Sequence, residues 1–347
     1  MEEGEKEALD LWKRFRELSI EKYKQIYARL NVRFDIYSGE SMFEEGMKEE
    51  LARLQERNLM KESNGAQIVD LNEYGLGVAI IKTKDGTTLY ITRDLAAASY
   101  RAREYKFDKM YYVVAMPQEL HFRQLFKMLD MVDYKWASNC HHIGFGMVSG
   151  MSTRSGNVVF LEDILDEAQR TMHDVMKQNE HKYSQIENPL QVSDIVGLSA
   201  VVVQDLSARR VKDYDFDWER ITSFEGDTGP YLQFAHSRLC SIERKSGIEL
   251  TGNEDLDLLK EDHAIQLVQV IARYPEALRQ AFISQEPCVI ITYAMSLSHA
   301  ISVTLEDVWV MGVEPNLAAA RLLLYYCARI VLGNCLTLIG LTPLERM

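Results

Sequence analysis

The sequence predicts an α/β region followed by an all-α region, and three observations lead to this prediction. Residues 87–150 alternate between strand-like and helix-like segments in the order βαβαβ, which is typical of a doubly wound nucleotide-binding sheet. From Leu161 onward the chain has almost entirely helical patterns. Of the 347 residues, 47% are hydrophobic and 26% are charged, so the composition is that of a globular protein of two or three domains.

The strands and helices follow one another in an order that can be read segment by segment. Residues 1–33 have the apolar spacing of a helix, and residues 34–86 have the turns and short apolar runs of a small α+β region. Met110–Met116 is wholly apolar, as expected for a strand buried on both faces. The remaining expected elements are a helix at 43–57, a strand at 87–91, helices at 94–103 and 121–132, and a strand at 140–148.

Two helices of the later region have clear signals. Gly229-Pro230 opens a helix, since proline suits a first turn, and either Asp227 or Thr228 is the expected N-cap. The last helix is expected at 317–338. One face of the helix that begins at Gly229-Pro230 is predicted to be lined by Tyr231, Phe234, Ala235, Leu239 and Ile242.

Composition narrows the classes of function. The net charge of −13 argues by itself against a nucleic-acid partner, yet local basic strips occur at 209–212 and at Arg238 with Arg244-Lys245; each is also explained by a solvated helix face. No run of 18 apolar residues occurs, so no membrane span is expected, and the acidic N-terminus is not a signal peptide. The five cysteines include no C-x-x-C pair, which favours reduced thiols in a cytosolic protein and no metal site.

The first segment whose residues suit a chemical function is Gly150-Met151-Ser152-Thr153-Arg154-Ser155-Gly156. It joins a strand to an apolar run, and its hydroxyls, backbone N–H groups and one cation suit the phosphates of a nucleotide. The alternative is a polar hairpin loop without a ligand.

Tyr90 and Asp94 form a second candidate site. A guanidinium group favours a planar carboxylate that accepts two parallel N–H bonds, and Asp94 is predicted at a strand-to-helix junction, where ligands bind in doubly wound sheets. Tyr90 precedes it by four residues and borders the same expected pocket. The alternative role of Asp94 is a helix cap.

Three further segments contain candidate residues. Pro117-Gln118-Glu119-Leu120-His121 ends a strand and starts a helix. In 225–238, Tyr231 offers an aromatic face for base stacking and Arg238 a cation for phosphate; Tyr231 as a core aromatic is the alternative. His142-Ile143-Gly144-Phe145 superficially matches a His-Ile-Gly-His signature, but it leads into a strand, and His141 with His142 lacks a third metal ligand.

These segments together resemble the arginyl-tRNA synthetases, class I enzymes, most closely of the fungal type. The resemblance rests on Gly-Met-Ser-Thr-Arg at 150–154, on 89–98, on 117–121, on 225–238, and on 318–329 and 340–347 near the end of the chain. It implies that Tyr90, Asp94 and Gln118 contact arginine, that His121, Met147 and Val148 border ATP, and that Met151, Ser152, Thr153 and Arg154 close on the phosphates. It also implies that Tyr231, Arg238 and Met347 contact arginine tRNA, and that Mg²⁺ accompanies ATP.

The resemblance divides the chain into four regions and leaves one part of the family fold unmatched. The expected regions are a helical segment with a small insertion at 1–86, the second half of the catalytic sheet at 87–160, a helical connection that contacts the tRNA stem at 161–223, and an α-helical anticodon-binding domain at 224–347. The first half of the class I sheet, with its His-Ile-Gly-His helix, is not matched. The chain by itself is therefore expected not to aminoacylate tRNA, and a protein partner is expected over the open sheet.

Three functions compete at this point. The first is an arginine–tRNA ligase, represented here by its second part and located in the cytoplasm, with a mitochondrial form left open. The second is a catalytically dead short paralogue that binds tRNA or a protein partner. The third, another class I synthetase such as the cysteinyl enzyme, is disfavoured by the Met-Ser-Thr-Arg loop and by the lack of zinc ligands.

Overall fold

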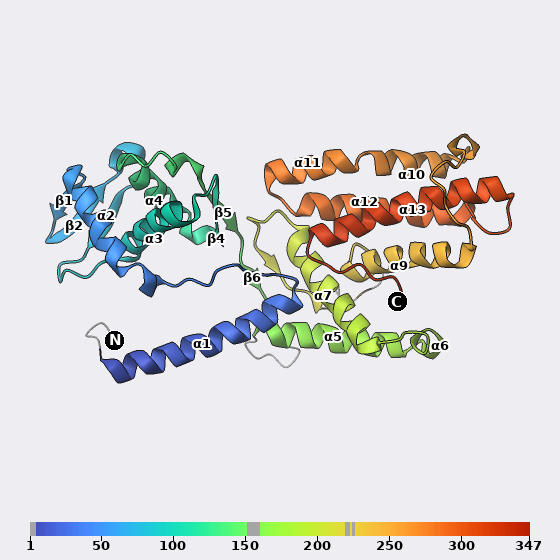
Figure 1. Ribbon diagram of the computed structural model, residues 1–347, viewed down its shortest axis with the longest axis horizontal. Helices are drawn as coiled ribbons and strands as arrows, with labels where there is room; N and C mark the ends of the chain where they lie inside the picture. Colours follow the sequence, from blue (N-terminus) through green and yellow to red (C-terminus); the bar gives the residue numbers. More distant parts are fainter. Residues whose placement is uncertain (1–4, 151–159, 219–222, 224–225) are drawn as a thin grey trace. The chain divides into compact units, whose positions relative to one another are not determined.

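A computed structural model describes residues 5–150, 160–218, 223 and 226–347, and the chain divides into two compact units (Figure 1). Unit 1 comprises Met1–Arg33 and Val148–Met347, and unit 2 comprises Phe34–Met147. This division groups α1 (Lys6–Arg29) with the C-terminal part of the chain. The boundaries of the four expected regions remain a prediction.

Unit 2 begins with a helix and a small antiparallel sheet. Helix α2 (Glu44–Glu56) is the helix expected at 43–57. The sheet has the order β1-β2-β3, formed by Met60–Ser63, Ala66–Asp70 and Val78–Lys82. Asn64 and Gly65 join the first two strands with φ values of 52° and 80°, as a tight hairpin turn with a right-handed twist requires.

The second part of unit 2 is a parallel strand–helix–strand unit. Strand β4 (Met110–Ala115) pairs in parallel with β5 (Cys140–Phe145), in a register that sets Met110 opposite Cys140. Helix α4 (Glu119–Met131) connects them and contacts α3 (Tyr90–Tyr105). The core of unit 2 joins this parallel unit to the antiparallel sheet through Leu54, Val69, Ile81, Leu95, Leu125 and Leu129.

The strand expected at 87–91 is wrong. Helix α3 begins at Tyr90, and of the expected strand only Thr88 forms an isolated bridge, with Lys82. The Thr92 hydroxyl donates to the carbonyl of Ile81 at 3.1 Å, so the first turn of the helix is fixed to the end of β3. This tertiary contact outweighs the β propensity of the Thr-Leu-Tyr-Ile run.

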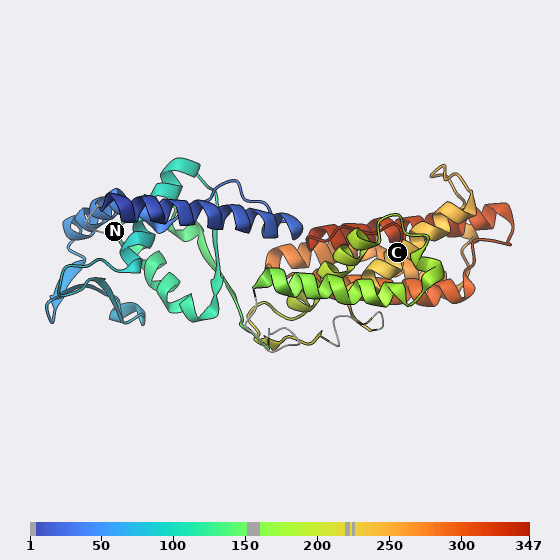
Figure 2. The same cartoon turned by 90° about the horizontal axis from the view of Figure 1, so that it is seen from below.

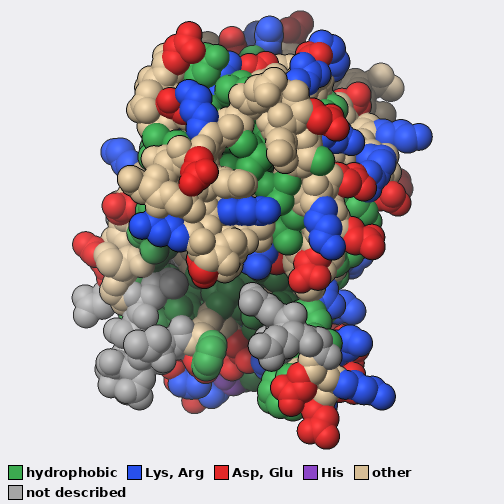
Figure 3. All heavy atoms as spheres, turned by 90° about the vertical axis from the view of Figure 1, so that its left-hand side faces the viewer, with side chains coloured by type: hydrophobic (Ala, Val, Ile, Leu, Met, Phe, Trp, Pro, Cys, Tyr) green, Lys and Arg blue, Asp and Glu red, His purple; other side chains and the backbone are tan. Residues whose placement is uncertain are grey.

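The expected burial of both faces of β4 is also wrong. Tyr112 is 9% exposed and packs on Phe122, with ring centroids 5.0 Å apart, whereas Val113 is 66% exposed. Helix α4 thus covers one face of β4, and the opposite face is exposed. Figure 3, a space-filling view of one face, shows hydrophobic side chains at the surface among acidic and basic ones.

The strand expected at 140–148 is two strands. β5 ends at Phe145, and β6 (Val148–Ser149) starts the second segment of unit 1, where it pairs in parallel with β7 (Tyr214–Asp215). The two-residue gap at Gly146-Met147 therefore coincides with the boundary between the units.

Unit 1 is predominantly a helical bundle. Helices α9, α12 and α13 contact one another and run alongside one another in both views (Figures 1 and 2). Leu232, Leu297 and Tyr325 are buried at their contacts. The α-helices in the described residues after 160 are α5 (Leu161–Lys177), α6 (Glu180–Tyr183), α7 (Pro189–Ser207), α9 (Gly229–Ser246), α10 (Asp262–Ala272), α11 (Tyr274–Ser284), α12 (Cys288–Asp307) and α13 (Pro315–Leu338).

Glycines allow two of these helices to approach α7 closely. A Cβ on Gly197 would lie 2.8 Å from the backbone of Ala168 in α5, and a Cβ on Gly229 would lie 1.9 Å from the carbonyl oxygen of Ser199. Thr228 caps α9 by accepting from the Tyr231 N–H, which decides between the two expected caps. The expected apolar face of α9 needs one correction: Phe234 is 39% exposed, and Leu232 lies in the core instead.

Three helices of the bundle, α7, α12 and α13, are long and apolar enough to cross a membrane by length and composition alone. Polar residues interrupt the apolar residues of these helices, so no unbroken run of 18 apolar residues occurs, yet the average hydropathy of each helix is high enough. Between 44% and 50% of each apolar stretch is buried inside the protein, because these helices supply much of the core of the bundle.

Candidate functional site

The structure brings two predicted site residues into direct contact in unit 2. Nε2 of His121, in the first turn of α4, lies 2.6 Å from Oδ2 of Asp94 in α3. The side chain of Asp94 is 37% exposed and that of His121 is 22% exposed, so the pair lies partly open to solvent. Asp94 is in the second turn of α3, and the N-cap position is Leu89, so the alternative role of Asp94 as a helix cap is wrong.

Tyr90 and Gln118 flank this pair in the sequence and are both exposed. Tyr90 lies one helical turn before Asp94 on the same face of α3, because residues four apart are neighbours on a helix. Gln118 is the N-cap residue of α4, directly after β4, and its side chain makes no capping bond. The second turn of α3 and the first turn of α4 therefore bring a carboxylate and an imidazole together, and the phenol of Tyr90 and the amide of Gln118 belong to the starts of the same two helices.

One of the two adjacent histidines of β5, His142, has a structural role, whereas His141 is exposed. His142 contacts the carbonyl of Val114 through Nε2 at 2.8 Å, and its ring stacks on Phe122 at 4.9 Å. The apparent signature at 142–145 is thus a parallel strand and not the start of a helix, as expected. Within the described part of the chain, no group of three or more His, Cys, Asp or Glu residues has the spacing for a metal ion.

The predicted nucleotide residues are only partly described. Met147 is 56% exposed at the end of unit 2, and Val148 packs in unit 1 against Ile164, Ala200 and Phe216. Met151, Ser152, Thr153 and Arg154 lie outside the described residues.

In unit 1, Arg238 and Met347 line one hollow of about 540 Å³, which we call the basic hollow. Four cations contribute to it, and in the described ranges none of the four forms an ion pair. Unpaired cations are notable in a chain with a net charge of −13, since they leave a local positive potential. The residues that line the hollow are Gln185, Ile186, Phe234, Ser237, Arg238, Ser241, Arg244, Lys245, Arg346 and Met347.

Two other predicted contacts lie elsewhere. Tyr231 does not line the basic hollow: it packs partly buried against the core, and its hydroxyl lies 3.0 Å from that of Ser302. The strip at 209–212 follows the end of α7 and is not a helix face. Nε of Arg210 donates to the carbonyl of Gln285 at 3.0 Å and lies 3.8 Å from the carboxylate of Glu286, which makes this residue structural.

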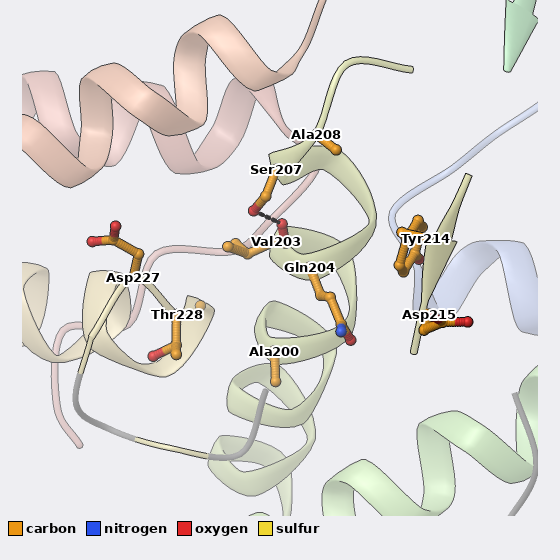
Figure 4. Close-up of a pocket in the computed structure, with 10 residues that line it drawn as sticks. Ala200, Val203, Gln204, Ser207, Ala208, Tyr214, Asp215, Asp227 and Thr228 are labelled. Carbon is orange, nitrogen blue, oxygen red and sulfur yellow. Dashed lines mark hydrogen bonds between the residues drawn. The ribbon is translucent and has the colours of Figure 1, made fainter. Parts of the chain in front are cut away.

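A smaller pocket of about 240 Å³ lies between the end of α7, β7 and the start of α9 (Figure 4). Gln204 points from α7 toward Tyr214 and Asp215, and its Oε1 is buried without a hydrogen-bond partner among the described residues. Burial, and then the Asp205 carboxylate, raise the pKa of the Tyr214 phenol, so the group stays protonated. The residues that line the pocket are Ala200, Val203, Gln204, Ser207, Ala208, Tyr214, Asp215, Asp227, Thr228 and Gly229.

The sequence prediction missed two buried polar residues of α9. Gln233 is 0% exposed and His236 is 4% exposed, and both hydrogen-bond to the C-terminal tail, residues 341–347. A signal was present in the sequence, because glutamine and histidine three residues apart interrupt an otherwise apolar helix face.

A parallel strand–helix–strand unit followed by a helical domain is an architecture of the class I tRNA synthetases. Residues 1–218 match the family described as tRNA synthetases class I (R), catalytic domain, and residues 232–347 match the DALR anticodon binding domain. The chain therefore belongs to the arginine branch of the class I tRNA synthetase family. This assignment removes the cysteinyl enzyme as an alternative.

Relatives and solved structures agree with this assignment. The probable cytoplasmic arginine–tRNA ligase of Dictyostelium discoideum is 54% identical over 348 residues, which cover 100% of this chain and 59% of that protein. The cytoplasmic arginine–tRNA ligase of Saccharomyces cerevisiae is 51% identical, with 58% of its length covered. The arginyl-tRNA synthetase structure from Plasmodium falciparum shares the fold, with a TM-score of 0.87 at 23% identity over 100% of this chain and 60% of that one. The chain thus spans somewhat over half the length of these relatives.

Proposed function

We propose that this chain supplies the arginine-side and tRNA-binding parts of an arginine–tRNA ligase. Such an enzyme activates arginine with ATP and transfers it to arginine tRNA. The contact between Asp94 and His121 carries the proposal, because it joins one residue that family likeness assigns to arginine and one that it assigns to ATP. The names of the relatives support a cytoplasmic location, although a mitochondrial relative from Saccharomyces cerevisiae is also 45% identical.

Asp94 is proposed to bind the guanidinium of arginine. Its Oδ2 is occupied by His121, and in the described residues no partner is present at Oδ1, which leaves an oxygen for a guanidinium N–H. His121 would fix the carboxylate rotamer in this arrangement and lie toward ATP. Tyr90 and Gln118, both exposed, would contact arginine from the two sides of the pair.

Met147, Val148 and the segment Met151–Arg154 are proposed to border the adenine and the phosphates. Mg²⁺ is proposed to enter with ATP, since Mg²⁺ is usually held by phosphates and one or two carboxylates and needs no dedicated protein cage.

The basic hollow is proposed to bind the phosphate backbone of tRNA. Arg238, Arg244, Lys245 and Arg346 supply the positive charge that phosphate binding needs. Tyr231 is proposed as a further tRNA contact at the start of the same helix, and Met347 lines the hollow itself.

A substitution in Asp94 tests the proposal. Asp94→Asn keeps the shape and removes the charge, and we expect a loss of roughly 2–5 kcal/mol in arginine recognition, as for a buried charged pair. The measurement is the arginine KM and kcat for aminoacylation by a chimera that joins the preceding segment of the Saccharomyces cerevisiae relative to this chain. Glu104→Gln, an exposed carboxylate near the end of the same helix, is the matched control. Unchanged arginine parameters in Asp94→Asn would refute the assignment.

The second candidate is a non-catalytic protein that binds tRNA or a protein partner, and the exposed face of β4 favours it. Tyr111 and Val113 are 44% and 66% exposed, which suits a face covered by another polypeptide. Aminoacylation by the chimera above the no-enzyme control would reject this candidate. The chain by itself is expected to remain inactive in the same assay.

A further inference from the structure

The C-terminal tail is irregular in structure yet well anchored. Helix α13 ends at Leu338, and no helix or strand follows in residues 341–347. Leu341 and Leu344 are nevertheless 5% and 8% exposed. Leu344 packs against Met172 and Val196, so the tail lies against α5 and α7.

Two side chains of α9 form hydrogen bonds with backbone groups of this tail. Oε1 of Gln233 accepts the N–H of Leu344 at 2.9 Å, and Nδ1 of His236 donates to the carbonyl of Leu344 at 2.8 Å. Nε2 of Gln233 donates to the carbonyl of Thr342 and to the hydroxyl of Ser199, both at 2.9 Å. Both backbone polar groups of Leu344 are thus held by residues one helical turn apart, and the side-chain amide of Gln233 is fully used.

The surroundings leave little freedom for another arrangement. Nε2 of His236 lies 3.2 Å from the position that a Cβ on Gly333 would occupy, so α13 presents a glycine where the imidazole fits. At the other end of the tail, Nδ2 of Asn31 donates to the carbonyl of Gly340 at 3.0 Å and to the hydroxyl of Thr342 at 3.1 Å. Buried backbone groups that lose such partners are unfavourable, because they have also lost their hydrogen bonds to water.

The anchored residue, Leu344, precedes Arg346 by two positions in the sequence, and Arg346 lines the basic hollow. Arg346 and Met347 line the hollow together with Arg238 and Arg244 of α9. Helix α9 therefore supplies three cations of the hollow, Arg238, Arg244 and Lys245, and also the two side chains that hold the tail. We infer that Gln233 and His236 are positioning residues, which hold the tail so that Arg346 completes the basic hollow as a binding site for the phosphates of RNA. This inference rests on the proposed tRNA-binding role of the hollow.

A double-mutant cycle on the full chain tests the inference, with an arginine tRNA transcript as the probe. Gln233→Met keeps the length of the side chain and removes its hydrogen bonds. Arg346→Ala removes one phosphate contact. We expect each single variant to raise Kd by roughly tenfold, the factor that corresponds to about 1.4 kcal/mol. In the Gln233→Met background Arg346→Ala should have no further effect, because Arg346 is already displaced. Additive losses would overturn the inference.

The control background is Gln280→Met, an exposed glutamine of α11, in which Arg346→Ala should retain its full effect. For His236, the Asn variant keeps a donor near the position of Nδ1 and should retain affinity, whereas His236→Phe should lose it. Equal losses in both His236 variants would contradict positioning through this hydrogen bond.

Amide hydrogen exchange distinguishes failure of the inference from failure of the proposed function. The Leu344 amide should be protected in the wild type and should exchange at least tenfold faster in Gln233→Met, while amides of α13 stay protected. If the wild type binds no tRNA, the proposed function fails. The exchange of Leu344 then still decides whether Gln233 holds the tail, and an unchanged rate would overturn the inference.

Discussion

At the scale of single residues, the environment of His236 keeps its ring neutral. Burial lowers the pKa of His236 below its ordinary value of 6.5, and this effect outweighs the hydrogen bond to the Leu344 carbonyl, which acts in the opposite direction. Nδ1 has to keep its proton as the donor to that carbonyl. A second proton on Nε2 would place a charge against Gly333 of α13, with no acceptor at that point among the described residues.

The stability of unit 1 should therefore depend on pH through His236. The pKa of His236 is higher in the unfolded chain than in the folded protein. As the pH falls below about 6.5, the unfolded chain therefore binds a proton more readily, and the free energy of unfolding should decrease. Urea unfolding at about pH 7.5 and about pH 5.5 measures this slope. His236→Asn, which does not titrate, should have a shallower slope, while the exposed His181→Asn should behave as the wild type. An unchanged slope in His236→Asn would contradict the prediction.

The residue types at the site were predictable, but their pairing was not. Asp94 and His121 were each identified from their own segment, and nothing in the sequence specifies how α3 and α4 pack to bring them within 2.6 Å. Arg238 and Met347 lie 109 positions apart and share one hollow only because the tail returns to α9. The roles of Gln233 and His236 depend on the same return of the chain.

At the scale of secondary-structure elements, α9 approaches α7 so closely at Gly229 that no side-chain atom fits between the two helices. A Cβ at position 229 would overlap the carbonyl of Ser199, so Gly229 has a packing role that needs no unusual backbone angle. The contact sets the start of α9 against α7 and thereby sets the direction of the helix that holds the basic hollow.

Gly229→Ala should destabilise unit 1 by about 3 kcal/mol, because overlap with backbone atoms cannot be relieved by a side-chain rotation. The shift in the urea midpoint at constant m-value measures the cost. Ser241→Ala, a small change in the same helix, should cost less than about 0.5 kcal/mol. A Gly229→Ala protein as stable as the Ser241→Ala protein would show that the helices can separate freely.

The errors in the predicted elements all come from tertiary contacts. The segment before Tyr90 has strand propensity but no strand partner beyond the single bridge at Thr88, so the helix starts early. Met110–Ala115 is apolar on both faces, yet only the face toward α4 is buried. In contrast, α2 and the start of α9 were predicted well, because the hydrophobic period of one and the Thr-Gly-Pro start of the other are local signals.

At the scale of the whole molecule, an acidic protein has to bind a polyanion through a restricted surface. With a net charge of −13, general attraction to RNA is absent, and the basic hollow supplies the local exception. Binding should therefore be selective for an RNA whose shape fits the hollow and should weaken as salt increases.

We expect the chain to bind arginine tRNA more tightly than an unrelated tRNA at physiological salt. Arg238→Ala should weaken binding and reduce the slope of log Kd against log salt by about one, the value for one phosphate contact. Arg279→Ala, an exposed arginine of α11, should leave both quantities unchanged. Fluorescence anisotropy with labelled transcripts measures them. Equal affinity for the two tRNAs would contradict the expectation.

The three apolar helices of the bundle also have a consequence for synthesis. As the chain leaves the ribosome, α7 emerges long before α12 and α13, the helices that complete the bundle. Until then its apolar residues face water and resemble a segment that an insertion machinery or a chaperone would recognise. We expect the newly made chain to need a chaperone during this interval, so the composition that stabilises the finished bundle also determines which cellular factors meet the protein first.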